Sequence, residues 1–179
     1  LGNGREFGLK DLHYTYQEGE GGIAEALGLT EHFAEGQRVC VILGDNIFSA
    51  DLSAGLKNFM VQKSGAKIFL KEVKDAERFG VAELSGKNVV GIEEKPKKPK
   101  SHYAVTGVYM YDNDVYSIVK TLKPSGRGEL EITDVNNAYI KRGTLTCEIL
   151  DGWWTDAGTF DSLMRAASLV HETPAMRGS

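Results

Sequence analysis

Apolar and polar residues alternate with two different periods along this chain, and the two periods predict helices and strands. Apolar side chains recur at helical spacing in residues 22–35, in the stretch from Leu52 to Met60, and in residues 159–172. We predict two further helices over residues 115–122 and 128–143. The second of these has Gly143 at its end, which is the usual position of a C-terminal glycine.

Strands are predicted where apolar residues form short runs, and these cover residues 38–44, 66–73, 79–84, 88–96, 103–111 and 145–150. The run 38–44 ends at Gly-Asp-Asn and is typical of a strand buried on both faces. Alternation of strands and helices in the first half favours a largely parallel sheet flanked by helices. A glycine-containing turn at 84–88 adds an antiparallel hairpin. We therefore expect one α/β domain, residues 1–179, with a mixed, mainly parallel sheet.

Composition and charge limit the classes of protein to consider. The 179 residues are 41% hydrophobic and 26% charged, as in globular domains, and the net charge of −4 argues against non-specific nucleic-acid binding. No apolar run is long enough to span a membrane, and the first residues contain no apolar signal core. Cys40 and Cys147 lie in apolar runs and are expected to be buried, reduced thiols. We expect a cytoplasmic protein without a zinc site, because the histidines show no metal-ligand spacing.

Two unusual stretches are interpreted as loops. Residues 95–100 (KPKKPK) lie between two predicted strands of an acidic protein, so we expect a solvated loop rather than a nucleic-acid patch. Residues 18–22 (EGEGG) resemble a phosphate-binding loop only in glycine content. They lack the Lys-Ser/Thr ending, and Glu18 and Glu20 would repel phosphate. A turn before the following helix is the simpler interpretation.

Several carboxylates stand where strands end. Asp45 follows the strand 38–44, and Asp156 lies in a turn before the last helix. Ligands bind at the carboxyl ends of strands in open α/β sheets, so both could converge on one Mg²⁺, although each could instead cap a turn. Glu94 and Lys95 end another strand, where they could reach a sugar hydroxyl and a phosphate or simply be exposed. The triplet Asp112-Asn113-Asp114 is either a metal-binding Asp-x-Asp or a strand-to-helix junction.

The chain resembles sugar nucleotidyltransferases, most closely the glucose-1-phosphate thymidylyltransferases. The resemblance rests on YTYQ, GGIAEA, VILGDN, ERFGVAEL, IEEKPKKPKSHYAVTGVYMYD, LKPSGRGELEITDVNNAYI and WTDAGTFDSL. These segments occur in the family's order and cover nearly the whole chain. The resemblance implies a Rossmann-like nucleotide-diphospho-sugar transferase fold. It also implies formation of dTDP-glucose and pyrophosphate from dTTP and glucose 1-phosphate.

The resemblance also implies roles for individual residues. Asp45 and Asp156 would hold Mg²⁺ against the phosphates, and Lys95 would bind the sugar phosphate. The remaining substrate contacts would come from Gln17 at the pyrimidine edge, the backbone of Gly22 near the base, Gly80, Glu94 and Val105 along the hexose, and Glu129 in the sugar pocket. Asp112 and Asp114 would lie at the far end of their strand, with Asp114 capping or charging the first turn of a helix.

One part of the family pattern has no match in this chain. The family begins with a loop of the form Gly-Gly-x-Gly-Thr-Arg-Leu and a later Pro-Lys, which hold the triphosphate, whereas this chain starts LGNGREFGLKDLHYTYQ. We therefore expect an N-terminally truncated domain with little or no transferase activity alone, and with an open sheet edge that could support a homo-oligomer. The alternatives are a non-catalytic binding remnant, a UTP-specific uridylyltransferase, or a metal-dependent glycosyltransferase that uses the Asp-x-Asp.

Overall fold

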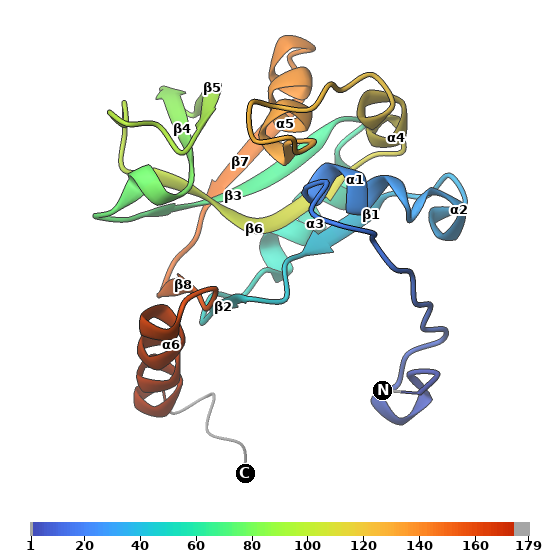
Figure 1. The fold of residues 1–179 in the computed structure, drawn as a ribbon, viewed down its shortest axis with the longest axis horizontal. Helices are drawn as coiled ribbons and strands as arrows, with labels where there is room; N and C mark the ends of the chain where they lie inside the picture. The colour runs from blue at the N-terminus through green and yellow to red at the C-terminus, as the bar shows by residue number, and fades with distance from the viewer. Residues whose placement is uncertain (1, 174–179) are drawn as a thin grey trace.

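One mixed sheet and a short two-stranded ribbon organise the computed structural model, which describes residues 2–173 (Figure 1). The sheet contains β1 (Val39–Ile42), β3 (Ala66–Glu72), β4 (Gly80–Ser85), β5 (Asn88–Glu94), β6 (Tyr103–Tyr111) and β7 (Leu145–Ile149). The ribbon pairs β2 (Asn46–Phe48) with β8 (Trp154–Asp156). The helices are α1 (Ile23–Gly28), α2 (Glu31–Ala34), α3 (Ser53–Val61), α4 (Asp114–Val119), α5 (Ile132–Lys141) and α6 (Phe160–Glu172). Within residues 2–173, none of the helices could span a bilayer.

Strand β6 is the centre of the sheet. The order is β5-β4-β6-β3-β7, and β1 also pairs with β6. The expected mixed sheet is confirmed, and β1, β3, β4 and β7 all run in one direction. Hydrogen-bonded neighbours are nevertheless mostly antiparallel, and β3–β7 is the parallel pair in the described part. The reason is that β6, running the opposite way, lies between β1 and β3.

The core lies on both faces of β3 and β6. On one face, Ile68 and Tyr109 belong to a cluster that α1, α4 and α5 cover. On the other, Phe69 and Met110 pack with Phe59 of α3. Successive strand residues point to opposite faces, so a nearly continuous apolar run is required where both faces are covered. This explains why β6 is buried from residue 104 to residue 111.

The predicted burial of residues 38–44 on both faces is wrong. Within β1, Val39 and Val41 are half-buried, whereas Cys40 and Ile42 are exposed. The reason is that the cluster around Phe59 does not extend to β1. Both cysteines are free thiols, as expected, but Cys40 is exposed and Cys147 only half-buried, so the prediction of two buried thiols is also corrected.

The helix predicted over residues 22–35 is two helices. The break falls at Thr30, whose hydroxyl donates to the Leu27 carbonyl at 2.7 Å. A threonine hydroxyl that bonds to a nearby carbonyl competes with the helical pattern. Helix α2 then starts with a hydrogen bond from the Ala34 amide to the Thr30 carbonyl at 3.1 Å.

Helix α5 starts at Ile132 rather than at the expected residue 128, because the preceding segment pairs with the loop before α1. The Leu130 amide donates to the Gly21 carbonyl at 2.8 Å, and the Leu130 carbonyl accepts from Ala24 at 3.2 Å. These backbone bonds hold Leu130 in a bridging position and keep it out of the helix. They also bring Gly22 and Glu129 close together, since a Cβ at Gly22 would lie 3.0 Å from the Glu129 Cβ.

Helix α6 agrees with its prediction and packs beside β8, apart from the main sheet (Figure 1). A reciprocal capping box starts it: Thr159 Oγ1 accepts from the Ser162 amide at 3.2 Å, and Ser162 Oγ accepts from the Thr159 amide at 3.0 Å. We expect Thr159→Ala to lower the free energy of unfolding by about 1 kcal/mol, because the Ser162 amide loses its side-chain acceptor. Urea denaturation followed by circular dichroism measures this. Ser168→Ala, at an exposed position of the same helix, is the control, and an equal loss there would contradict a capping role.

Candidate functional site

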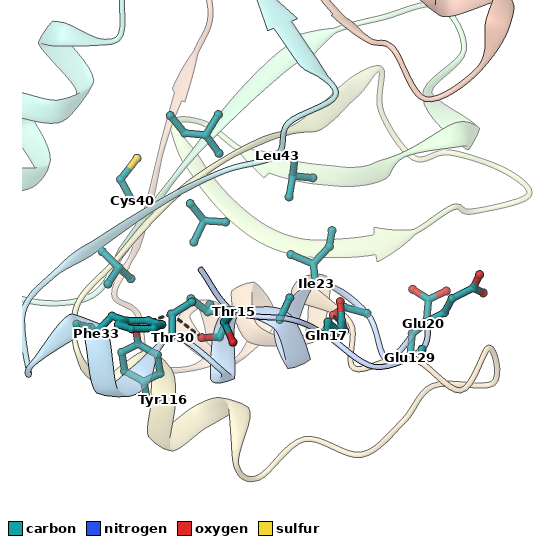
Figure 2. Close-up of a pocket in the computed structure, with 18 residues that line it drawn as sticks. Thr15, Gln17, Glu20, Ile23, Thr30, Phe33, Cys40, Leu43, Tyr116 and Glu129 are labelled. Carbon is teal, nitrogen blue, oxygen red and sulfur yellow. Dashed lines mark hydrogen bonds between the residues drawn. The ribbon is translucent and has the colours of Figure 1, made fainter. Parts of the chain in front are cut away.

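Two adjoining cavities contain all the residues to which the family resemblance assigns a site role. The first, of about 970 Å³, lies between α1, α2 and β1 and is lined by Gln17 and Gly22; we call it the α1 cavity (Figure 2). The second, of about 550 Å³, is the carboxylate cavity. Its lining includes Asp45, Gly80, Glu94, Lys95, Val105 and Asp156. Ile23, Leu43 and Glu129 line both cavities, so the two lie side by side.

The α1 cavity has an apolar wall and a polar end. Figure 2 shows Phe33 and Tyr116 at one end and Gln17, Glu20 and Glu129 at the other. Small-molecule sites commonly combine apolar walls with a few polar groups that fix the orientation of the ligand. This cavity has that composition, with Gln17 as its uncharged polar side chain near Glu129.

The Gln17 side chain is held by its surroundings. Its Nε2 donates to the Gly22 carbonyl at 3.0 Å and to Glu25 Oε2 at 2.6 Å. Gly22 has φ 91° and ψ 170°, a backbone conformation that is essentially restricted to glycine. The structure thus brings Gln17 and Gly22, both selected from the sequence, together at this cavity. The sequence did not indicate Glu25, whose position in α1 looked like an ordinary polar helix position.

The β2–β8 ribbon brings the two aspartates together. Asn46 is paired with Asp156 in the ribbon, and the Ala157 amide donates to the Asp45 carbonyl at 2.7 Å. Both carboxylates face the same point above Gly158, since a Cβ placed there would lie 3.4 Å from Asp45 Oδ2 and 3.5 Å from Asp156 Oδ2. The local backbone pairing thus joins two residues that are far apart in the sequence.

Each carboxylate has a polar neighbour. Asn46 Nδ2 donates to Asp45 Oδ1 at 2.8 Å, while Asn46 Oδ1 accepts from the Gly107 amide and from Trp154 Nε1. Arg78 Nη2 lies 3.2 Å from both oxygens of Asp156. The same guanidinium donates to Asp75 at 2.8 Å, and this hydrogen bond lowers the pKa of the Asp75 carboxyl.

The pair Asp45 and Asp156 fits a hard divalent cation. Mg²⁺ is usually held by one or two carboxylates, with water and substrate phosphates completing its shell. Among residues 2–173 there is no cluster of three or more His, Cys, Asp or Glu side chains arranged to hold a metal ion. A cation here would therefore be held by these two carboxylates and by ligands from the substrate. Asp156 would then bind the cation in place of Arg78.

The opposite side of the carboxylate cavity is built around Glu94. Glu94 Oε2 accepts from Thr133 Oγ1 at 2.6 Å, and Gly80 pairs with Glu94 across the β4–β5 ladder. Lys95 adopts a left-handed backbone conformation (φ 43°), which is uncommon for a residue other than glycine and redirects the chain at the cavity edge. Its amide donates to the Phe79 carbonyl at 3.0 Å.

Comparison with known proteins identifies the family. Residues 1–173 match the nucleotidyl transferase family. The chain belongs to this family. It is 46% identical over 174 residues to the glucose-1-phosphate thymidylyltransferase of Neisseria meningitidis, and 44% identical over 182 residues to that of Xanthomonas campestris. These matches cover 95% and 99% of this chain, but the chain spans only about three fifths of the relatives' length (60% and 61%).

One solved structure supports the same family, and a second shares the fold. A Bacillus anthracis crystal structure with sucrose, assigned as a glucose-1-phosphate thymidylyltransferase, superposes with a TM-score of 0.91 at 56% identity. The match covers 97% of this chain and 70% of that one. A UDP-glucose pyrophosphorylase in complex with UDP-glucose has a TM-score of 0.80 at 22% identity and covers 89% of this chain, which shows a shared fold.

The site of this nucleotidyl transferase contains residues that sequence reasoning did not select. Arg78, Arg127, Asn46, Thr133 and Trp154 all line the carboxylate cavity. Arg127 pairs with Glu131 at 2.8 Å, which raises the pKa of Arg127. Asn46 follows Asp45 directly, and Trp154 precedes Asp156 by two positions in a strand. For these two residues, nearness in the sequence to a selected aspartate could have indicated a place in the site.

The Asp-x-Asp triplet is a structural junction in this nucleotidyl transferase. Asp112 Oδ1 accepts from the Tyr139 hydroxyl at 2.6 Å and from the Asp114 amide at 3.2 Å. Asp114 stands in the first turn of α4 and pairs with Arg142 at 3.2 Å. Neither aspartate lines the two cavities. This agrees with the expectation of a strand-to-helix junction in which Asp114 charges the first turn of the helix.

Proposed function

We propose that this protein acts as a glucose-1-phosphate thymidylyltransferase, joining dTTP and glucose 1-phosphate into dTDP-glucose and pyrophosphate. The observation that carries the proposal is the convergence of Asp45 and Asp156 on one point, in a cavity that also contains Glu94 and Lys95. That cavity adjoins the one lined by Gln17. The 46% identity to a thymidylyltransferase is further support.

In the proposed reaction, a phosphate oxygen of glucose 1-phosphate attacks the α-phosphorus of dTTP, and the bond to pyrophosphate breaks. Such a transfer needs alignment and charge neutralisation rather than a covalent nucleophile. Mg²⁺ held by Asp45 and Asp156 would supply part of that neutralisation. Lys95 would bind the sugar phosphate, and its exposed position at the cavity edge leaves the ammonium group able to approach it.

The remaining residues would orient the two substrates. Gln17 would hydrogen-bond the pyrimidine, with the Gly22 backbone close to the base. The hexose would lie along Gly80, Glu94 and Val105, with Glu129 at the border of the two cavities. Thr133 holds Glu94 Oε2, and Glu94 Oε1 lies 3.7 Å from Arg127 Nη2, so a sugar hydroxyl would bind Oε1 beside this guanidinium. The proposed setting is the cytoplasm, which suits two free thiols.

A UTP-specific enzyme is the second candidate, favoured by the shared fold with a UDP-glucose pyrophosphorylase. Gln17 can pair with uracil as well as thymine, because both bases present the same hydrogen-bonding edge. The thymidine assignment has stronger support, since the relatives at 44–56% identity are thymidylyltransferases. A homo-oligomer formed through the free edge of β1 is a further proposal, which size-exclusion chromatography with light scattering would test.

Calorimetric titration of dTDP-glucose and dTTP with Mg²⁺, together with a pyrophosphate-release assay, tests the proposed function. We expect dTDP-glucose to bind, and EDTA to weaken that binding because the carboxylate pair would lose its cation. ADP-glucose, with a purine base, is the control ligand. Absence of dTDP-glucose binding would contradict the proposal. Binding without pyrophosphate release would favour the non-catalytic alternative, and transfer of glucose to an acceptor would favour a glycosyltransferase.

A further inference from the structure

The amide of Gln17 can adopt only one of its two orientations. Its end group lies against the Gly22 carbonyl and the Glu25 carboxylate, at 3.0 and 2.6 Å. Both partners are acceptors, so the group facing them must be the Nε2 donor. The oxygen Oε1 therefore points away from these two partners, and within residues 2–173 no hydrogen bond to it is formed.

Glu25 reaches this position because Gly21 has no side chain. A Cβ at Gly21 would collide with all three terminal atoms of the Glu25 carboxylate. Gly21 itself is fixed by the hydrogen bond that its carbonyl accepts from Leu130. The carboxylate is thus folded back over the loop toward Gln17 rather than extended into solvent, and its charge-assisted hydrogen bond to Nε2 is short.

We propose that Glu25 is a positioning residue that determines which nucleobase the α1 cavity accepts. By holding Nε2, Glu25 makes Gln17 present the acceptor Oε1 to the base. A base with an N3–H donor, such as thymine or uracil, complements this oxygen. Cytosine, whose N3 is an acceptor, does not. This inference rests on the proposed function and adds a residue, Glu25, to the determinants of its nucleotide specificity.

The size of the effect follows from the cost of an unmatched acceptor pair. Placing the cytosine N3 against Oε1 leaves two acceptors facing each other in a partly enclosed site. A buried polar group without a partner costs roughly 1–3 kcal/mol, which corresponds to a loss of affinity between about 5-fold and about 150-fold. The contact between Gln17 Oε1 and the base N3–H does not involve the 5-methyl group of thymine. It should therefore contribute equally to the affinities for dTTP and dUTP.

The test is calorimetric titration of dTTP, dUTP and dCTP, with Mg²⁺, into the full chain and its variants. For the wild-type chain we expect dTTP and dUTP to bind at least about tenfold more tightly than dCTP. Glu25→Lys replaces an acceptor by a donor that attracts Oε1, so the dTTP-to-dCTP affinity ratio should fall about tenfold or more. Glu25→Gln keeps an acceptor oxygen and should retain the wild-type ratio within about threefold. Glu18→Lys makes the same charge change at an exposed neighbouring position and is the control.

Gly21→Ala provides an independent variant that leaves the Glu25 charge in the protein. Because the new Cβ would occupy the place of the carboxylate, Glu25 must swing away from Gln17. We expect the ratio to fall by at least about threefold, since the Gly22 carbonyl alone then holds Nε2. Glu25→Met removes the acceptor without adding a donor, so the dTTP-to-dCTP affinity ratio should fall by a similar factor. This variant replaces Glu25→Lys in the test if the lysine variant does not fold.

The outcomes separate this inference from the proposed function. The positioning role is supported if the dTTP-to-dCTP affinity ratio falls in Glu25→Lys and Gly21→Ala but stays near the wild-type value in Glu25→Gln and Glu18→Lys. An unchanged ratio in folded Glu25→Lys or Glu25→Met overturns that role and leaves the proposed function intact. Failure of the wild-type chain to bind either dTTP or dTDP-glucose overturns the proposed function, and the inference falls with it.

Discussion

Replacing Asp45 or Asp156 by asparagine is expected to weaken divalent-cation binding in the presence of dTDP-glucose by at least about 100-fold. The two carboxylates face one point above Gly158, and each supplies an oxygen that an amide cannot match in charge. Mn²⁺ can replace Mg²⁺ as a paramagnetic probe, so the fraction of free Mn²⁺ in an electron paramagnetic resonance titration measures the effect. The titration does not depend on turnover.

Asp114→Asn is the matched control for this experiment. Asp114 is an exposed aspartate outside both cavities and is paired with Arg142, so Mn²⁺ affinity should not change. An equal loss in Asp114→Asn and Asp45→Asn would contradict a specific site at the β2–β8 ribbon. Asp156→Asn also releases Arg78 from its ion pair, so its thermal unfolding should be recorded together with the Mn²⁺ titration.

Gly22→Ala is expected to lower the free energy of unfolding by at least about 3 kcal/mol. The backbone at Gly22 has φ 91° and ψ 170°, which an alanine adopts only with strain. In addition, the new Cβ would lie 2.6 Å from the Leu130 carbonyl oxygen, a backbone atom that cannot move without breaking the contact between α1 and the segment before α5. Urea denaturation followed by tryptophan fluorescence gives the change.

Gly19→Ala measures the cost of a positive φ without the collision that a Cβ at Gly22 would make with the Leu130 carbonyl. Gly19 also has a positive φ of 76°, but a Cβ there would meet nothing within 4 Å. We expect a loss of only about 1 kcal/mol at Gly19. If the two variants were equally destabilised, the close approach between Gly22 and Leu130 would not be a stabilising constraint. The Gly22 variant should also bind dTDP-glucose poorly, because Gly22 lines the α1 cavity.

Much of the fold was predictable where local pattern and tertiary environment agree. The hairpin of β4 and β5 turns at Gly86, which has φ 61°, and the apolar run 103–111 becomes the central strand. Helix α6 begins directly after Thr159, as its amphipathic pattern indicated. At the site, the positions of Asp45 and Asp156 at strand ends were sufficient to suggest that they meet, and the structure places them together.

The remainder depended on contacts between distant parts of the chain. Nothing near residues 38–44 indicates that one face of β1 is exposed, because this depends on where Phe59 packs. The break before α2 comes from a single hydroxyl of Thr30. Likewise, the role that we propose for Glu25 requires its carboxylate to fold back over Gly21, which helical periodicity does not reveal.

The two-stranded ribbon has a consequence for the order in which the protein assembles. Asp156 can approach Asp45 only after β8 has paired with β2, and this pairing closes a loop that contains most of the main sheet. Closing long loops is entropically costly and slow, and short, peripheral pairings open before the core does. We therefore expect the ribbon amides to exchange hydrogen for deuterium faster than those of β3 and β6. A ligand that bridges the two aspartates would then keep β2 and β8 paired and slow the separation of α6 from the rest of the protein.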